Sequence, residues 1–138
     1  MPLSMYQASV PLFTQTLSGL SNVLGKGVAH YAAKGLDTND LVGMALAPDM
    51  MTLAQQVQQA CHHSVVGVAR FAETTEPDLG GTDTDIDGMQ ARIAASLAFM
   101  AAVTPDQMEG SETRRAEIQI RIGPVAFPGQ DLLLHFTI

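Results

Sequence analysis

The longest helical pattern in the chain, between Pro48 and Glu76, constrains its fold most strongly. Apolar or small side chains recur there every three or four residues: Met50, Leu53, Val57, Cys61, Ser64, Val68 and Phe71. This spacing places them on one face of an α-helix. Further residues widen that face on one side: Ala54, Val65 and Ala72. A helix with so broad an apolar face packs against other helices, so we expect this segment to be the central helix of a bundle.

Two more segments repeat with the same period. The first covers about residues 4–34, and its apolar positions are Val10, Phe13, Leu17, Leu20, Leu24, Val28 and Tyr31. The other covers about residues 85–103, with Ile86, Met89, Ile93, Leu97 and Met100. Ser4 is a suitable N-terminal cap of the first segment, and Thr84 or Asp85 of the other; Gly35 is a suitable C-terminal stop. Pro11 predicts a kink or a late start of the first helix, and Pro77 predicts the end of the central one.

The pattern changes after Gly110. Apolar residues from Ala116 to Ile122 alternate with polar ones, which indicates a half-buried strand. Gly123 and Pro124 predict a turn, and residues 125–127 a short returning strand. Residues 129–138 have the pattern of the first turns of a further helix. The sequence therefore predicts a single all-α domain over residues 1–138: an up-and-down four-helix bundle with a small β-hairpin before a truncated fourth helix.

Composition excludes several classes of function. Apolar residues make up 46% of the 138 residues and charged residues 15%, which excludes a disordered chain. The net charge is −7 with only seven Lys and Arg, so nucleic acid and anionic membranes are not expected partners. The sequence contains no apolar run of about 18 residues, the length that a membrane span needs. The N-terminus lacks a basic signal region, and one cysteine excludes an internal disulfide. We expect a soluble, cytoplasmic protein.

The central segment carries three adjacent residues whose side chains can react or bind a metal, Cys61, His62 and His63. Successive helical residues are about 100° apart, which places Cys61 in the apolar face. His62 then lies on the shoulder of that face, and His63 lies about 160° away, on the solvent side. The two imidazoles diverge, and a ligand pair on one helix needs a spacing of three or four residues. His62 remains a candidate ligand for a site between helices, whereas Cys61 is expected to be a core residue.

Other candidate residues are isolated. His135 lies in an apolar stretch, so we expect it to be at least partly buried, either as a satisfied core histidine or as a ligand. His30 is expected at the surface. Four aspartates cluster in one segment, Asp78, Asp83, Asp85 and Asp87, but the glutamate of a calcium loop is missing and helix capping accounts for the cluster. The sequence contains no complete catalytic motif.

Five stretches together carry a resemblance to a known family. They are S-M-Y-Q-A-S-V-P (residues 4–11), L-A-P-D-M (46–50), Q-V-Q-x-A (56–60), E-G-S-E (109–112) and G-Q-x-L-L-L-H-F (129–136). Through them the chain resembles, over essentially its whole length, an uncharacterised bacterial domain-of-unknown-function family of the DinB/YfiT-like superfamily of four-helix bundles. The resemblance implies the same bundle fold for this chain.

The resemblance also implies a metal site. Characterised members of that superfamily bind zinc or nickel through three histidines, and some are transferases or isomerases that use low-molecular-weight thiols. One histidine is expected on the second helix and an H-x-x-x-H pair on the fourth. His62 stands near the first position, and His135 is the histidine of the fourth. We therefore predict His62 and His135 as the ligands of an incomplete zinc or nickel site, and expect no other cofactor.

Three hypotheses about function remain open, and so does the question of whether the chain is an enzyme. The leading one is a DinB-like bundle without a complete metal site, which acts through helix packing as a homodimer. The dimer would bury an apolar strip left open by the short fourth helix, lined by Val57, Val68, Ile93 and Leu97. The second is a metal-dependent thiol transferase or hydrolase. The third is a module that binds a small apolar molecule between the central helix and the hairpin.

Overall fold

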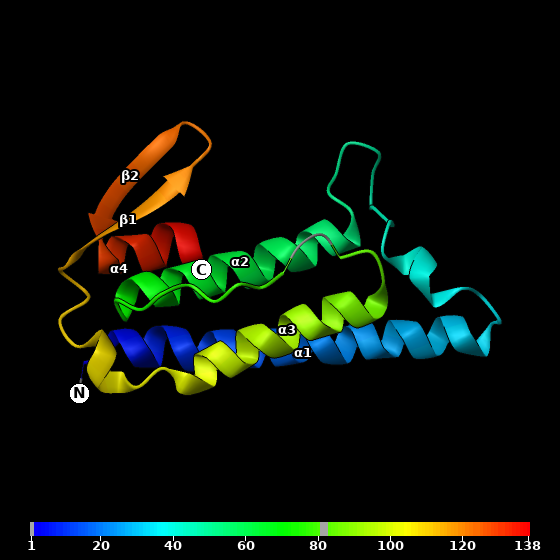
Figure 1. Ribbon diagram of the computed structural model, residues 1–138, viewed down its shortest axis with the longest axis horizontal. Helices are drawn as coiled ribbons and strands as arrows, with labels where there is room; N and C mark the ends of the chain where they lie inside the picture. Colours follow the sequence, from blue (N-terminus) through cyan, green and yellow to red (C-terminus); the bar gives the residue numbers. More distant parts are fainter. Residues whose placement is uncertain (1, 81–82) are drawn as a thin grey trace.

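Three long helices form the body of the protein. The computed structural model describes residues 2–80 and 83–138, and in them α1 spans Met5–Ala33, α2 Leu53–Phe71 and α3 Ile86–Ala102. Figure 1 shows these helices running alongside one another, with short 3₁₀ turns at η1 (Thr38–Leu41) and η2 (Pro105–Met108). The hairpin of β1 (Arg115–Ile120) and β2 (Gly123–Pro128) follows, and then α4 (Gly129–Leu132), which continues as the π-helical turn η3 (Leu133–Thr137). The predicted helical bundle with a small hairpin is confirmed.

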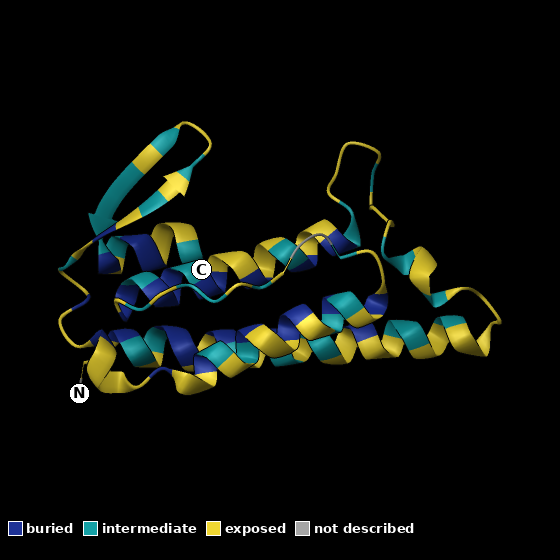
Figure 2. Ribbon diagram, viewed as in Figure 1, coloured by how far each residue is buried: buried dark blue, intermediate teal, exposed yellow. Residues whose placement is uncertain are grey.

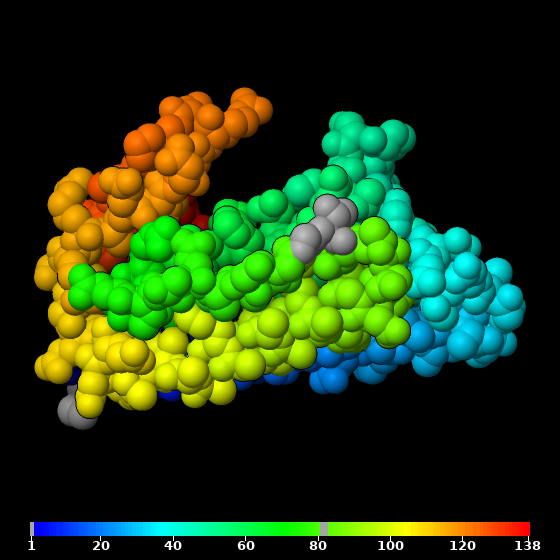
Figure 3. All heavy atoms as spheres, in the orientation of Figure 1, coloured from blue at the N-terminus to red at the C-terminus, as the bar shows by residue number. Residues whose placement is uncertain are grey.

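Local capping sets where the helices begin. The Ser4 side chain accepts from the Gln7 backbone, and Asp85 accepts from Gly88, so both predicted caps are confirmed. The central helix starts later than the pattern predicts, because Thr52 and Gln55 form a reciprocal capping box. Met50, predicted on the apolar face of that helix, therefore precedes α2 and is 45% exposed. The segment between η1 and α2 stands out from the body in Figure 3.

The ends of the helices correct two further predictions. Gly35, at φ 69°, terminates α1 as expected, and the Leu36 N–H donates to Tyr31 O across the turn. Pro11 lies inside α1, so its prediction of a late start is wrong. Pro77 does not end α2. That helix ends at Phe71, because Glu73 at φ 51° takes the chain out of the helical conformation several residues earlier.

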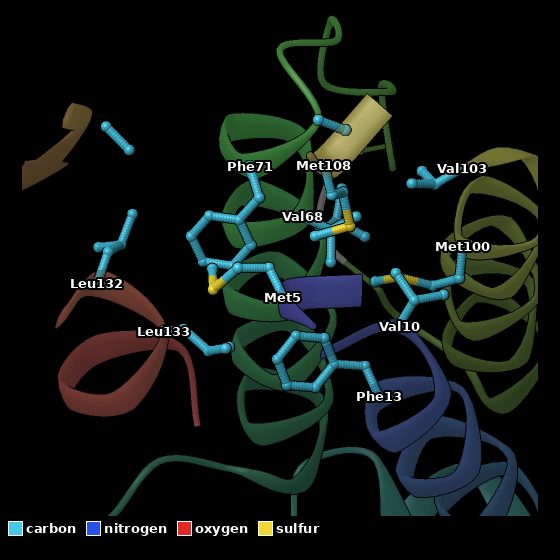
Figure 4. Packing of buried hydrophobic residues seen from close by; sticks show 13 residues of the cluster. Met5, Val10, Phe13, Val68, Phe71, Met100, Val103, Met108, Leu132 and Leu133 are labelled. Carbon is cyan, nitrogen blue, oxygen red and sulfur yellow. The ribbon is translucent and has the colours of Figure 1, made fainter. Parts of the chain in front are cut away.

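The core has two clusters along the bundle (Figure 2). One joins α1, α2 and α3 near the start of α3: Leu17, Leu24, Ala54, Val57, Cys61, Ile86, Met89 and Ile93. The other also includes η2, β1 and α4, and Figure 4 shows Phe13, Phe71, Met100, Met108 and Leu132 converging there. Val57, Val68 and Ile93 are at most 1% exposed, so the predicted open strip along them is wrong. These side chains are covered because α2 packs on both α1 and α3.

Two arginines connect the hairpin to the end of α2. Arg70 Nε donates to Glu117 O at 2.8 Å, and Arg114 Nη2 donates to Phe71 O at 2.6 Å. β1 and β2 pair antiparallel with Ile118 opposite Val125, which confirms the predicted strands. The first strand ends at Ile120 rather than Ile122, whose side chain is 87% exposed at the turn. Prolines at both ends of β2 lack an N–H, which makes that strand a poor template for another chain.

A buried ion pair attaches the segment before α3 to that helix. Arg92 Nε donates to Asp83 Oδ2 at 2.8 Å, and both side chains are only 8% exposed. Arg92 also donates to the Gly80 carbonyl at 3.3 Å. The sequence places Asp83 in an aspartate cluster and gives no sign of this pairing.

Within the described residues, none of the helices combines the length and apolar character that a bilayer span requires.

Gly129 is the position where α4 approaches the rest of the chain most closely. Its N–H donates to Arg114 O at 2.9 Å, and a Cβ added to it would collide with the Ser111 carbonyl oxygen, a backbone atom that cannot rotate away. We predict that Gly129→Ala lowers the free energy of unfolding by about 1–3 kcal/mol, as overpacking does. Urea unfolding followed by circular dichroism measures this change.

Gly19→Ala is the matched control. Gly19 lies inside α1 and has no atom within 4 Å of the added methyl group. Because alanine loses less backbone entropy in a helix, this variant should gain about 0.5–1 kcal/mol. A Gly129→Ala protein as stable as the wild type would contradict the close contact between Gly129 and the Ser111 carbonyl group.

Candidate functional site

A cavity of about 460 Å³ lies between α1, α2 and the C-terminal turn. Its lining comes from α1 (Leu12, Phe13, Thr16, Leu17), α2 (Gln56, Gln59, Ala60, His63, Ser64) and residues 136–138. We call it the α1–α2 cavity. Its volume is in the range of small-molecule sites, and apolar side chains with a few polar groups are typical of such sites. The described lining residues include no Lys, Arg, Asp or Glu.

A smaller cavity lies between α2 and the hairpin, where the sequence predicts the ligand site. His62, His63, Gly67 and Ile118 are among its lining residues, but its volume is only about 70 Å³. That volume is well below the roughly 300 Å³ at which small-molecule pockets begin. The cavity at the predicted location is therefore small, because the hairpin and η3 pack closely against α2.

His63, not His62, faces the larger cavity. His63 lines both cavities, whereas His62 lines only the smaller one, and their ring centroids are 5.7 Å apart in an edge-to-face arrangement. Both side chains are exposed, which agrees with a surface His63 but not with a boundary His62. Helical geometry placed His63 on the solvent side correctly, but it assumed a single buried face and gave no sign that His63 lines a cavity. Gly67 lies about 120° from Cys61 on the helix and is also buried.

Gly67 is the sequence signal for this second buried face. A Cβ added there would lie 2.5 Å from Thr137 Cγ2, so η3 rests directly against α2 at this glycine. His63 lies one turn before Gly67 and Ala60 lies one turn before His63, which puts the three residues along one side of the helix. Ala60 and Gly67 therefore flank His63 on one side of α2, and η3 packs against this side at Gly67.

Desolvation shifts the pKa of His63 and of Cys61 in opposite directions. Desolvation lowers the pKa of His63 below its ordinary 6.5, and the neighbouring His62 lowers it further. The imidazole is therefore neutral at pH 7 and can accept a hydrogen bond. Burial raises the pKa of the Cys61 thiol, and a hydrogen bond with Ser96 opposes this only in part. The thiol is fully buried, so its expected role as a core residue is confirmed.

His135 does not reach either cavity. It is exposed, so its expected burial is wrong. The buried side chains of this segment are Leu132 and Leu133, and the turn carries His135 to the outside. His30 is exposed as expected. In the part of the chain that the structure describes, no three His, Cys, Asp or Glu side chains group so that they could hold a metal ion. The described residues therefore do not fit the three-donor site that the resemblance implies.

Comparison with known proteins places the chain in a family. The model of the family named Domain of unknown function (DUF1993) matches residues 5–138. The chain belongs to this family. A search of curated proteins finds no match. The crystal structure of a DinB family member protein from Shewanella denitrificans superposes with a TM-score of 0.82, over 95% of this chain and 74% of that one. At 24% identity this similarity shows a common fold, and it confirms the resemblance to the DinB-like bundles.

The environment of His63 makes a prediction about pH. We expect its imidazole, followed by the chemical shift of its ring protons in NMR, to titrate below the ordinary 6.5. His62→Gln should raise this pKa only part of the way, because desolvation is the larger cause and remains. The unfolded chain binds this proton more tightly, so the folded state should lose stability as the pH falls through 6.5.

His63→Gln assigns the resonance and tests the effect on stability. Without this imidazole, the fall in the free energy of unfolding between pH 7 and pH 5 should become smaller. A titration of His63 at or above its ordinary pKa would show that the cavity wall does not desolvate the ring.

Proposed function

We propose that this DUF1993-family protein binds a small molecule in the α1–α2 cavity. The observation that carries the proposal is a cavity of about 460 Å³ whose wall combines apolar side chains with uncharged polar ones, among them the imidazole of His63. A pocket of this kind gains affinity from apolar burial and orientation from a few polar groups. A ligand with an apolar body and a few uncharged hydrogen-bonding groups matches it.

The lining also restricts the charge of the ligand. No described residue of the cavity wall is a Lys, Arg, Asp or Glu, so an ionic ligand group would be desolvated without a counter-charge. Gln56 and Gln59 supply amides and Thr16 a hydroxyl, which can pair with neutral donors or acceptors. The expected ligand is therefore uncharged.

A metal-dependent reaction stays a separate hypothesis. In it His62 and His135 are partial ligands of zinc or nickel in a thiol transferase or hydrolase. His62 and His63 are the imidazoles that lie next to each other, whereas His135 is exposed on the C-terminal turn. Because the described residues provide no group of three metal donors, we derive no step through a metal.

Filling the cavity should abolish binding of a neutral apolar probe. Ala60 lies in the wall, so Ala60→Trp places an indole where the ligand would lie. We expect the wild type to bind N-phenyl-1-naphthylamine with a rise in fluorescence, and Ala60→Trp to weaken that binding by about tenfold or more. Ala98→Trp, on the exposed side of α3, is the matched control and should bind as the wild type does.

A charged analogue of the probe tests the expected neutrality. The anion 1-anilinonaphthalene-8-sulfonate has a similar apolar body and should bind more weakly, because its sulfonate would lose water without a partner. Equal binding of the neutral probe to Ala60→Trp and to the wild type would exclude the α1–α2 cavity as the site.

A homodimer is the second part of the proposal. Three apolar side chains at the edge of the cavity remain exposed, Leu12 at 41%, Phe136 at 40% and Ile138 at 67%. Contact with another copy would remove them from water. We expect size-exclusion chromatography with light scattering to give twice the mass of one 14.6 kDa chain.

Charge substitutions locate the dimer surface. Leu12→Glu should produce monomers, because it puts a carboxylate into the interface. Val23→Glu changes an apolar residue of α1 that is even more exposed than Leu12, 64% against 41%, and does not line the cavity, so it should leave the dimer intact. A monodisperse monomer of the wild type would exclude the dimer.

A further inference from the structure

A second cavity, of about 680 Å³, lies at the end of the bundle where three separate parts of the chain meet. Its lining comes from residues 2–6 and Ala8, from residues 105, 106, 108–110 and 112, and from Gln130, Leu133 and Leu134. Figure 1 shows the start of α1, η2 and α4 at this same end. We call it the terminal cavity. It shares no described lining residue with the α1–α2 cavity.

The inner surface of the terminal cavity is apolar. Met5, Met108 and Leu133 line it and belong to the packed core, with at most 8% of each side chain exposed. Figure 4 shows these three side chains within the core cluster. At its edge, Leu3 is 73% exposed and Leu134 57% exposed. The apolar surface therefore continues from the core to the solvent.

Every charged side chain described in the lining is acidic. Asp106, Glu109 and Glu112 line the cavity, and no Lys, Arg or His does so among the described residues. The ion pairs that the described residues form lie elsewhere, at Arg70–Glu76, Arg92–Asp83 and Arg114–Glu73. Three carboxylates that form no ion pair with another described residue lie beside a low-dielectric wall, which concentrates negative potential in the cavity.

We propose that the terminal cavity binds an amphiphilic organic cation, a small amine with an apolar body. The ammonium group pairs with the carboxylates, and the apolar body lies against Met5, Met108 and Leu133. Tyr6, half-buried, also lines the cavity, and an aromatic ring attracts a cation that contacts its face. The charge of the wall and its apolar surface are complementary to the two halves of such a ligand.

The lining of the terminal cavity comes from parts of the chain that are far apart in the sequence. Gly110, at φ 76°, turns the chain between Glu109 and Glu112, and all three residues line the cavity. Three of the five stretches that carry the family resemblance meet here: residues 4–11, 109–112 and 129–136. The α1–α2 cavity contributes no carboxylate among its described residues, so the two cavities select ligands of different charge.

Three probes with one apolar body test the proposal on the unaltered protein. They are 4-phenylbutylamine, 4-phenylbutanol and 4-phenylbutyrate, with binding measured by NMR shift perturbation and calorimetry. We expect the amine to bind at least about tenfold more tightly than the alcohol, and the carboxylate not to bind. Amine binding should weaken as salt is added. Equal affinity of all three probes, or shifts confined to the α1–α2 cavity, would overturn the proposal.

Neutralised variants separate a built site from general attraction to an acidic protein. The triple variant Asp106→Asn, Glu109→Gln, Glu112→Gln should reduce the affinity for the amine to that for the alcohol. The control triple, Asp40→Asn, Asp49→Asn, Glu117→Gln, removes the same charge from exposed positions outside the lining and should bind as the wild type does. Equal losses in both triples would overturn the proposal.

A peptide of alternating Leu and Lys serves as the competing occupant. Binding of this peptide that depends on Glu109 and Glu112, with no binding of the amine, would assign the surface to a basic protein partner and overturn the small-molecule proposal. Displacement of the peptide by the amine would support it.

Discussion

The enclosure of α2 on three sides is the constraint on which the rest of the structure depends. Cys61, Val68 and Phe71 are completely buried, and Gly67, on another side of the same helix, is buried as well. α1, α3 and η3 all contact this helix of 19 residues. The side chains on those sides must be small or apolar, and their sizes determine how closely each neighbouring element packs against α2. The α1–α2 cavity lies where this packing is incomplete.

Periodicity predicts the helical core well, because amphipathic spacing reports directly on the buried face. Val10, Phe13 and Leu17 of α1, and Met89, Ile93 and Met100 of α3, are buried where their spacing placed them. The same method fails for a helix with more than one buried face. The single apolar direction assumed for α2 gave the exposure of His63 correctly but missed a second buried side of the helix, where Gly67 contacts Thr137.

Boundaries and long-range pairs were less predictable for a different reason. Local geometry, rather than the prolines at 48 and 77, sets the ends of α2. The capping box of Thr52 and Gln55 sets its start, and the positive φ of Glu73, 51°, sets its end. Arg92 and Asp83 lie nine residues apart across a helix start, and Arg70 reaches Glu117 in another element. Such pairs depend on the tertiary arrangement, so no local sequence pattern predicts them. The open strip predicted along Val57 and Val68 failed likewise, because α1 and α3 cover it.

The C-terminal segment links the two cavities physically. Gln130, Leu133 and Leu134 line the terminal cavity, and Phe136 to Ile138 line the α1–α2 cavity. Glycines hold this segment near both ends, with Gly129 against the Ser111 carbonyl and Gly67 against Thr137. Close contacts of this kind leave the segment little freedom, so one wall of each cavity is in place before a ligand arrives. A preformed wall spares the ligand the entropy of ordering it, and this favours binding in both cavities.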